Sequence, residues 1–430
     1  MSKLFKILTG MLLASLVLAA CAPAATPTEE PIPEMSEMCM GAEPGATVTI
    51  MYQWSGAEEE SLNNIFKPLL DECGIQIVAE STRDDAVLDT KAKSTPPDIL
   101  FWPSTSPAKL YGAQLKDLST VGANASSYGQ GWIDGGTVDG KWSAIAVKAD
   151  FKTVIWYSPA QFDANGYSVP TTLDELDALV EKMVADGNVP WSMGFESEAA
   201  TGWTGSDFVQ DLMLAQQGPA YVSGLLDGSI AYDDAGVVAA YEQYAKWASD
   251  PAYTVGGADG TVNTGFLDAI YKVFSDPPEA MMVKQSGFAG GEAAKQYPDL
   301  VYGTDYDFFE FPGAQGAQGG ADFMMVFGDS PATHAMVAYL TSAEGATAWA
   351  QSGLGLSPNK QAVGNYADEV NGKLGELLAN ASGFTFDLGD GIGAPFNTAE
   401  WAALIEVVQG GDIAAALAPA AAAQKEALGQ

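Results

Sequence analysis

Tryptophan and acidic residues lie close together at several places in this chain of 430 residues. An indole ring offers a flat apolar face, whereas a carboxylate accepts strong hydrogen bonds from hydroxyl groups. A ligand that combines C–H faces with many hydroxyls, such as a carbohydrate, needs both kinds of group. The neighbouring pairs are Trp54 with Glu58, Glu196 with Trp203, and Trp401 with Glu400.

Other polar residues stand in a similar context. Gln285 comes shortly before Phe288, and Asp322 follows Gly319 and Gly320, where the backbone can approach a ligand closely. Ser55 and Trp102 fall where strands are expected to end, and ligands often lie beyond the carboxyl ends of strands. The candidate ligand-binding residues are Trp54, Ser55, Glu58, Trp102, Glu196, Trp203, Gln285, Asp322 and Trp401.

Each candidate also has a purely structural interpretation. A tryptophan can belong to a core, and Glu196 can be a hydrated loop carboxylate. Glu58 lies in a run of acids at the start of a predicted helix, where the helix dipole favours negative charge. The sequence leaves these alternatives open.

The composition argues against several other kinds of chemistry. A net charge of −36 does not suit nucleic acid, because phosphate binding requires Lys and Arg. One histidine, three cysteines and the lack of CxxC and HExxH motifs argue against a zinc site. No Gly-x-Ser-x-Gly nucleophile elbow is present. We therefore expect no metal, no cofactor and no catalytic residues.

The elements that position the candidates alternate between strands and helices. Residues 142–147 and 153–157 read as strands, and Thr172 with Glu175 forms a capping box that begins a helix ending near Gly187. Residues 47–50 read as a strand leading into a helix that we expect Pro68 to interrupt. This alternation predicts a doubly wound α/β layer.

The order of these motifs resembles the extracellular solute-binding proteins of ABC sugar importers, family 1. The resemblance is closest to the α-glucoside-binding subgroup and covers roughly residues 46 to 430. Tyr157-Ser158 departs from the Tyr-Asn that is common in the family. The motifs that carry the likeness are Gly166-Tyr167-Ser168-Val169-Pro170-Thr171-Thr172, Pro190-Trp191, Thr201-Gly202-Trp203, Gly319-Gly320-Ala321-Asp322 and Ser357-Pro358-Asn359-Lys360.

This resemblance implies a two-lobed periplasmic-binding-protein-like α/β fold with a hinged cleft. The chain would cross between the lobes near Asp150, Asp305 and Leu340. The protein would be a monomer that binds a carbohydrate, performs no chemistry and docks on the subunits of an ABC permease. The expected divisions are 46–151 (first lobe), 152–304 (second lobe), 305–341 (first lobe) and 342–430 (second lobe).

The N-terminal residues have the features of an exported lipoprotein. Residues 1–20 form a predicted signal peptide with Lys3, Lys6 and a short apolar run, and Leu18-Ala19-Ala20-Cys21 resembles a lipobox. Cys21 would carry the lipid that anchors the protein outside the cytoplasm. The Pro-rich residues 21–45 would form a disordered tether. Cys39 and Cys73 could pair in an oxidising compartment, but the sequence does not decide this.

Two other functions remain open from the residues alone. A lipoprotein glycosidase would need two carboxylates about 5–9.5 Å apart across a sugar, and the chain has many acids. A binder of peptides, polyamines or cations could use the same fold. An acidic cluster in the cleft would favour a cation, whereas aromatic stripes would favour a sugar.

Overall fold

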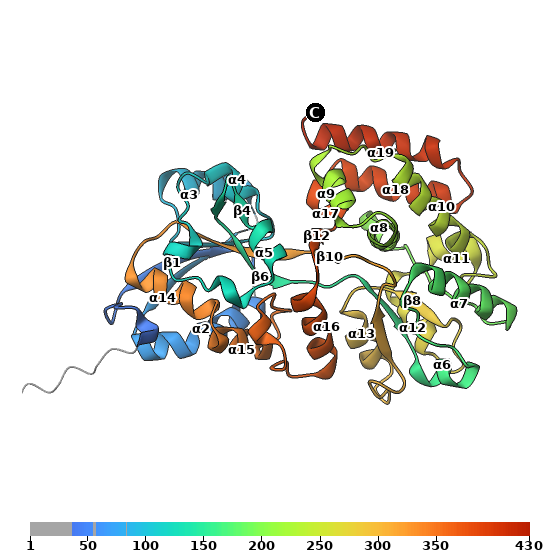
Figure 1. Cartoon of the computed structure of the whole chain (residues 1–430), viewed down its shortest axis with the longest axis horizontal. Helices are drawn as coiled ribbons and strands as arrows, with labels where there is room; N and C mark the ends of the chain where they lie inside the picture. Colours follow the sequence, from blue (N-terminus) through green and yellow to red (C-terminus); the bar gives the residue numbers. More distant parts are fainter. Residues whose placement is uncertain (1–36, 55–56, 83) are drawn as a thin grey trace, which may run out of the picture. The chain divides into compact units, whose positions relative to one another are not determined.

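The computed structural model describes residues 37–54, 57–82 and 84–430 (Figure 1). The first of its sheets has five strands in the order β2-β1-β3-β11-β6. β1 is parallel to β2 and β3, whereas β11 is antiparallel to β3 and β6. We call this sheet and the helices packed on it the first lobe. The strands are β1 (Thr47–Tyr52), β2 (Gln76–Ser81), β3 (Ile99–Trp102), β6 (Ile145–Ala149) and β11 (Ala321–Val326).

Helix α2 (Ala57–Cys73) follows β1 and continues through Pro68, so the expected interruption was wrong. Pro68 lies on the exposed side of the helix, where the carbonyl that loses its partner can be hydrated. The buried Phe66 and Leu69 lie on either side of Pro68 and hold both halves against the core. A disulfide joins Cys39 to Cys73 at the end of α2, which settles the pairing that the sequence left open.

The remaining elements of the first lobe surround its sheet. These elements are η1 (Glu37–Cys39), α3 (Asp85–Ser94), α4 (Ser106–Tyr111), η2 (Leu118–Thr120), η3 (Ala125–Ser127), α5 (Gln130–Gly135), β4 (Thr137–Val138), β5 (Lys141–Trp142), α14 (Pro331–Leu340), α15 (Ala343–Ser352), η5 (Lys360–Ala362) and α16 (Glu369–Asn380). Asp84 caps α3 because its Oδ1 accepts a hydrogen bond from the backbone N–H of Ala86 at 2.8 Å.

A three-stranded antiparallel sheet in the order β8-β7-β9 begins the second lobe. Its strands are β7 (Val154–Tyr157), β8 (Met282–Lys284) and β9 (Asp307–Glu310). The predicted capping box at the start of α7 (Leu173–Ala185) is confirmed. Thr172 Oγ1 accepts from the Glu175 N–H at 3.2 Å, and Glu175 Oε2 accepts from the Thr172 N–H at 3.2 Å.

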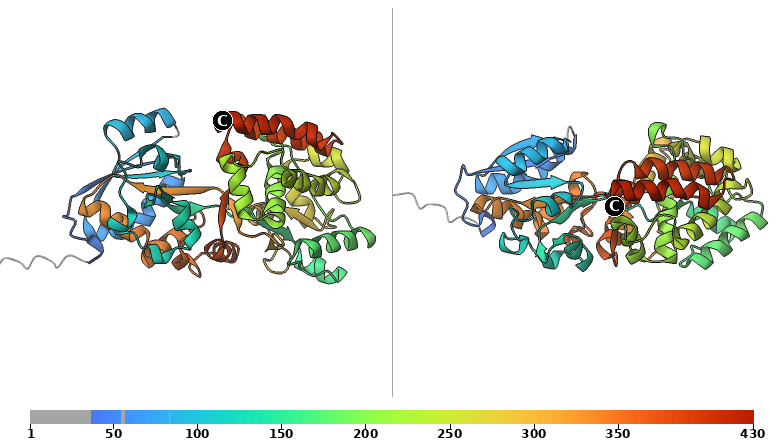
Figure 2. Two further views of the ribbon diagram at one scale, coloured as in Figure 1. Left: turned by 45° about the horizontal axis from the view of Figure 1, so that its top comes forward. Right: turned by 90° about the horizontal axis from the view of Figure 1, so that it is seen from above.

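Most of the other helices of the second lobe bury a second apolar core that includes Trp191, Tyr241 and Trp247. Figure 1 and the right-hand view of Figure 2 show the last two helices, α18 and α19, side by side. Besides α7, the helices of the second lobe are α6 (Pro159–Asn165), η4 (Glu198–Ala200), α8 (Trp203–Gln216), α9 (Pro219–Asp227), α10 (Ala235–Ser249), α11 (Gly257–Asn263), α12 (Phe266–Phe274), α13 (Ala289–Gln296), α17 (Leu388–Ile392), α18 (Phe396–Val408) and α19 (Ile413–Ala427).

Three chain segments cross between the lobes, at residues 150–153, 311–320 and 381–387. β10 (Ala317–Gly319) in the second segment pairs in parallel with β12 (Phe384–Phe386) in the third. The first segment runs beside the second, because the Lys152 N–H donates to the Gln318 carbonyl at 3.0 Å. We refer to them as the first, second and third crossovers.

Two of the lobe boundaries expected from the sequence, at residues 305 and 342, were wrong. β9 pairs with β7, so residues 307–310 lie in the second lobe although we expected the return to the first lobe at residue 305. α15 packs on α2 and on η5, and α16 packs on η5. The second lobe therefore resumes after α16, and not at residue 342. Burial of the apolar faces of α15 and α16 accounts for this difference.

Several sequence-based predictions fall outside the described residues. These are the signal peptide, the lipid attachment at Cys21, the tether as far as residue 36, and Ser55. The prediction that the tether extends to residue 45 was wrong, because Cys39 and Ala42 are buried in the folded body and Cys39 is held by the disulfide to Cys73. Over the parts of the chain that the structure describes, no helix has both the length and the apolar character needed to span a membrane.

Candidate ligand-binding site

A cleft of about 1030 Å³ is lined by residues of both lobes. This volume is at the upper end of the range of about 300–1,000 Å³ that is usual for ligand sites. The cleft lies beyond the carboxyl ends of β3 and β6, where ligands of α/β sheets commonly bind. Its lining includes Trp102, Thr105, Lys109, Lys148 and Asp322 from the first lobe, Asp150 from the first crossover, and Leu226, Asp227, Phe384, Phe386 and Asp390 from the other side.

Asp322 lies at the start of β11, where the pairing with β6 shifts register between Asp322 and Phe323. Its Oδ2 accepts a hydrogen bond from Trp54 Nε1 at 3.1 Å and lies 3.7 Å from Lys148 Nζ. Lys148 also binds Glu58 Oε1 at 2.8 Å. Burial raises the pKa of Asp322, and the positive charge of Lys148 opposes this shift. The structure thus gathers three predicted residues around Lys148, which sequence reasoning missed.

The two tryptophans predicted for the first lobe occupy different positions. Trp102 lines the cleft, although only 3% of its surface is exposed. Trp54 is also buried and packs against Phe101, with ring centroids 5.2 Å apart, and against Trp349 at 6.2 Å. Trp54 therefore reaches the cleft through its hydrogen bond to Asp322 and does not itself line it.

The opposite wall of the cleft is built on β12 and α17. Phe384, Thr385 and Phe386 all line the cleft, and Thr385 is the most buried of the three. Asp387 then begins α17 by accepting a hydrogen bond from the Asp390 N–H at 2.9 Å. The pKa of Asp390 is raised by partial desolvation at the cleft and by the carboxylate of Asp387, although 71% of the Asp390 side chain is exposed. The alternating Phe-Thr-Phe run was the sequence signal for this wall, but it gave no indication of which chain segment lies opposite.

A comparison with protein families identifies the protein type. The family model described as "Bacterial extracellular solute-binding protein" matches residues 64–373. The chain belongs to this family. The recognition made from the sequence motifs is confirmed.

Curated relatives of this solute-binding protein extend over most of its length. The α-glucosides-binding periplasmic protein AglE of Rhizobium meliloti (strain 1021) is 31% identical over 392 residues, which are 85% of this chain and 84% of the relative. The osmoprotective compounds-binding protein GgtB of Synechocystis sp. (strain ATCC 27184 / PCC 6803 / Kazusa) is 29% identical, over 86% of this chain and 91% of the relative.

Solved structures share the fold of this solute-binding protein. The bacterial solute receptor AcbH, described with an exclusive preference for β-D-galactopyranose, has a TM-score of 0.74 at 18% identity and covers 89% of this chain and 99% of its own. The apo form of RafE from Streptococcus pneumoniae has a TM-score of 0.70 at 17% identity, over 90% of this chain and 99% of its own. At such identities the likeness shows the two-lobed fold alone.

Trp203 and Trp401, the tryptophans predicted for the second lobe, lie together beside Gly202. Trp203 is the first residue of α8, is half-buried and meets Phe266 edge to face at 5.5 Å. Trp401 packs so closely on Gly202 that a side chain there would meet its Cβ at 2.8 Å. Gly202 also has a φ of +114°, which favours glycine. Neither tryptophan belongs to the lining of the cleft described above, so their ligand contact stays a prediction.

Glu196 and Gln285 are also separate from this lining. Glu196 is exposed, and its backbone N–H donates to the Thr264 carbonyl at 3.0 Å, beside Gly265. Gln285 is only 3% exposed, and its Oε1 accepts from the Ser286 N–H at 2.9 Å. The structure thus divides the predicted residues into one group at Asp322 and a second at Gly202. Phe266 links Glu196 to the second group, because its N–H donates to the Glu196 carbonyl at 3.3 Å and its ring packs on Trp203.

The carboxylates of the described residues form no cluster suited to a metal ion. Residues 37–54, 57–82 and 84–430 contain no group of three or more His, Cys, Asp or Glu residues arranged to hold a metal ion.

Proposed function

We propose that this solute-binding protein captures a carbohydrate, an α-glucoside or another oligosaccharide, for an ABC importer. The ligand enters the cleft between the lobes, hinge closure encloses it, and the closed form delivers it to the permease. Closure is favoured because the ligand makes more contacts in the closed state than in the open one. The protein acts as a monomer held outside the cytoplasm by a lipid on Cys21.

The observation that carries the proposal is the chemistry of the two cleft walls. Phe384 and Phe386 provide aromatic faces on one side, and Asp322 with Lys148 provides acceptor and donor groups on the other. Aromatic faces suit the C–H surfaces of a sugar ring, and paired charged groups suit its hydroxyls. The names of AglE and RafE, which concern α-glucosides and raffinose, support the same ligand class.

Calorimetric titration with a panel of sugars tests this proposal. The panel contains maltose, trehalose, sucrose, raffinose and galactose, with spermidine and a short peptide as other ligand classes. We expect saturable binding of at least one α-glucoside and none of spermidine or the peptide. A ligand specific for the folded protein also raises the melting temperature, which provides an independent readout. Binding of spermidine or peptide without any sugar would contradict the proposal.

The same samples test the absence of catalysis. After prolonged incubation of the protein with each bound oligosaccharide, we expect no release of reducing sugar. Sustained release that is lost in an Asp322→Asn or Asp390→Asn variant would instead identify a glycosidase that uses two carboxylates. The matched control is Asp299→Asn, which changes an acid outside the cleft lining.

A further inference from the structure

Helix α8 presents a buried polar stripe to all three crossovers. Asp207, Gln210 and Asp211 are each at most 2% exposed, and their spacing places them on one face of the helix. Gln210 Nε2 donates to the Phe386 carbonyl at 2.8 Å, and Gln210 Oε1 accepts from the Leu388 N–H at 2.8 Å. The third crossover is therefore hydrogen-bonded to α8 immediately before and after Asp387.

The second crossover reaches the same helix through Gln318. Its side-chain amide donates to the backbone carbonyl of Asp207. Its backbone N–H is held by the first crossover, since it donates to Thr153 Oγ1 at 2.8 Å. The three segments that connect the lobes are thus fastened to one another and to α8.

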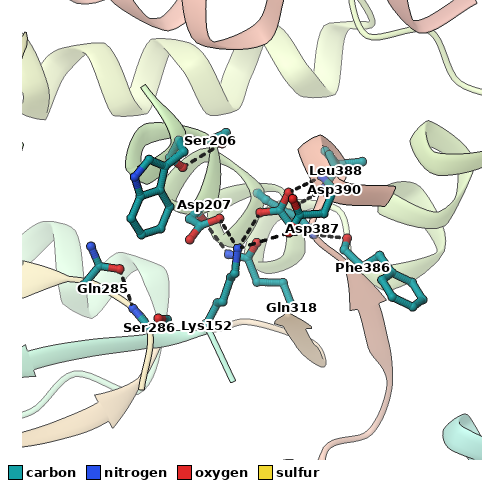
Figure 3. A network of polar contacts seen from close by, with 12 residues as sticks. Lys152, Ser206, Asp207, Gln285, Ser286, Gln318, Phe386, Asp387, Leu388 and Asp390 are labelled. Atoms are coloured by element: carbon teal, nitrogen blue, oxygen red, sulfur yellow. Dashed lines mark hydrogen bonds and ion pairs between the residues drawn. The ribbon is translucent and has the colours of Figure 1, made fainter. Parts of the chain in front are cut away.

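Lys152 of the first crossover places its ammonium group between α8 and the third crossover (Figure 3). Its Nζ lies 3.2 Å from Asp207 Oδ1, 3.1 Å from Asp387 Oδ2 and 4.0 Å from Asp390 Oδ2. The Lys152 side chain is 14% exposed, and those of Asp207 and Asp387 are 2% and 7% exposed. Charges at such depth need a partner of opposite sign.

The pKa values of the carboxyl groups around Lys152 are shifted by burial and by the nearby charges. Burial raises the pKa of Asp207 well above its usual range, although Lys152 and Lys284 oppose the shift. Asp387 keeps its charge, because Lys152 lowers its pKa against the effect of burial. The ammonium of Lys152 is thus the counter-charge that allows Asp387 to stay ionised beside α8.

The position of Asp387 determines the cleft wall beside it. Phe386 precedes Asp387, and Asp390 lies one helical turn beyond it with its N–H bound to Asp387 Oδ1. Both Phe386 and Asp390 line the cleft. Lys152 itself is absent from that lining, so it acts through these neighbours.

We infer that Lys152 is a positioning residue for ligand capture, because its bonds to Asp207 and Asp387 hold Phe386 and Asp390 in place on the cleft wall. The inference rests on the proposed function for its effect on ligand affinity. Its structural part, the fixing of the third crossover by Lys152, does not require that function.

Four variants separate positioning from general stability. Lys152→Met removes the charge at similar size, and Lys152→Arg keeps it. The double variant Lys152→Met/Asp387→Asn removes both charges, so that no uncompensated carboxylate remains at position 387. Lys182→Met is the control, because its exposed ion pair with Asp186 lies on the surface of α7.

Two measurements are made on the full chain. The first is hydrogen exchange at the Leu388 and Asp390 amides, which the network protects. The second is calorimetric affinity for whichever of maltose, trehalose, sucrose, raffinose and galactose the wild type binds. We expect Lys152→Met to speed exchange at both amides and to weaken binding by about tenfold or more. Lys152→Arg should restore both properties, and Lys182→Met should change neither.

The double variant decides whether Lys152 acts by position. We expect it to recover the melting temperature, since the buried charge is gone, but not the affinity. Recovery of both would overturn the inference, as would unchanged exchange at Leu388 and Asp390 in a folded Lys152→Met protein. If the wild type binds none of the sugars, the proposed function fails, and the exchange rates with their rescue by arginine still decide the role of Lys152.

Discussion

The indole N–H of Trp54 donates to Oδ2 of Asp322 and so ties the end of β1 to the start of β11. The two residues are 268 positions apart in the chain. Trp54 is 4% exposed, whereas the Asp322 side chain is 16% exposed at the cleft. A buried core residue therefore orients a carboxylate that lines the cleft.

This relationship predicts different outcomes for the two residues. Trp54→Phe removes the donor to a partly buried carboxylate, and we expect the unfolding free energy to fall by about 1–3 kcal/mol. Asp322→Asn keeps an acceptor for Trp54 but loses its charge, so we expect weaker ligand binding with a smaller loss of stability. Chemical unfolding and calorimetric titration of both variants measure these effects. Equal stability of Trp54→Phe and wild type would contradict the role of the hydrogen bond.

The second prediction concerns Trp203 and Trp401. Replacing either by alanine should weaken sugar binding by roughly 5- to 150-fold, which corresponds to about 1–3 kcal/mol for one large apolar contact. Both side chains are half-buried, so the unliganded variants should remain folded. Titration and a melt of each variant test this, with Val301→Ala, an exposed position of the second lobe, as the control. Unchanged affinity in both variants would show that these tryptophans only pack beside Gly202.

The third prediction is that stability declines as pH rises. Burial raises the pKa of Glu400 well above its usual range, and burial likewise raises the pKa of Asp211 to about 6. The folded state therefore holds protons that the unfolded chain has already released above about pH 4. Because stability falls with pH wherever the folded state binds more protons, these groups lower the unfolding free energy from about pH 4 through pH 6 and beyond.

Glu400→Gln provides the test of this sign. Glutamine still accepts the hydrogen bond that the Tyr232 hydroxyl gives to Glu400, but it has no proton to lose. We expect the fall of unfolding free energy between pH 4.5 and pH 8 to be shallower in Glu400→Gln than in wild type. Glu406→Gln, an exposed position on the same helix, should leave the slope unchanged. A slope that rises with pH, or one that Glu400→Gln leaves intact, would refute the argument.

The fourth prediction concerns the proposed anchor. Cys21→Ser should move the protein from the membrane fraction to the soluble fraction and leave sugar affinity intact, because the cleft residues all lie far along the chain from Cys21. Fractionation after a high-salt wash, followed by titration, measures both properties. Retention of Cys21→Ser on washed membranes would mean that something other than a lipid on this residue holds the protein there.

Local patterns predicted much of the fold. The capping box at Thr172 and the strands that became β6 and β7 needed only neighbouring residues, and the motif order was enough to identify the family. The prediction that Pro68 interrupts α2 was wrong, because the helix is held together there by the burial of Phe66 and Leu69 on either side. The boundaries at 305 and 342 differed because strand pairing and helix packing are made with distant partners, β7 for β9 and α2 for α15.

The residues of the candidate site were harder to predict from the sequence than the fold. Trp102 and Asp322 were found because they flank strands or follow glycines. Lys148 and Asp390 were missed, since a lone lysine or aspartate carries no signal until its partners from other segments are known. Trp203 and Trp401 were identified by family likeness, and the structure places them beside each other without placing them in the cleft lining.

The polar stripe of α8 has a consequence for the kinetics of folding. Lys152 and Asp387 are separated by 235 residues, and Gln210 and Leu388 by 178. During synthesis, Asp207 and Gln210 exist long before the segment that completes their hydrogen bonds. The entropy of closing such long loops must be overcome before these contacts contribute, which slows folding. We therefore expect the second lobe to acquire its final structure only after nearly the whole chain has emerged, so that the chain stays incompletely folded throughout its synthesis.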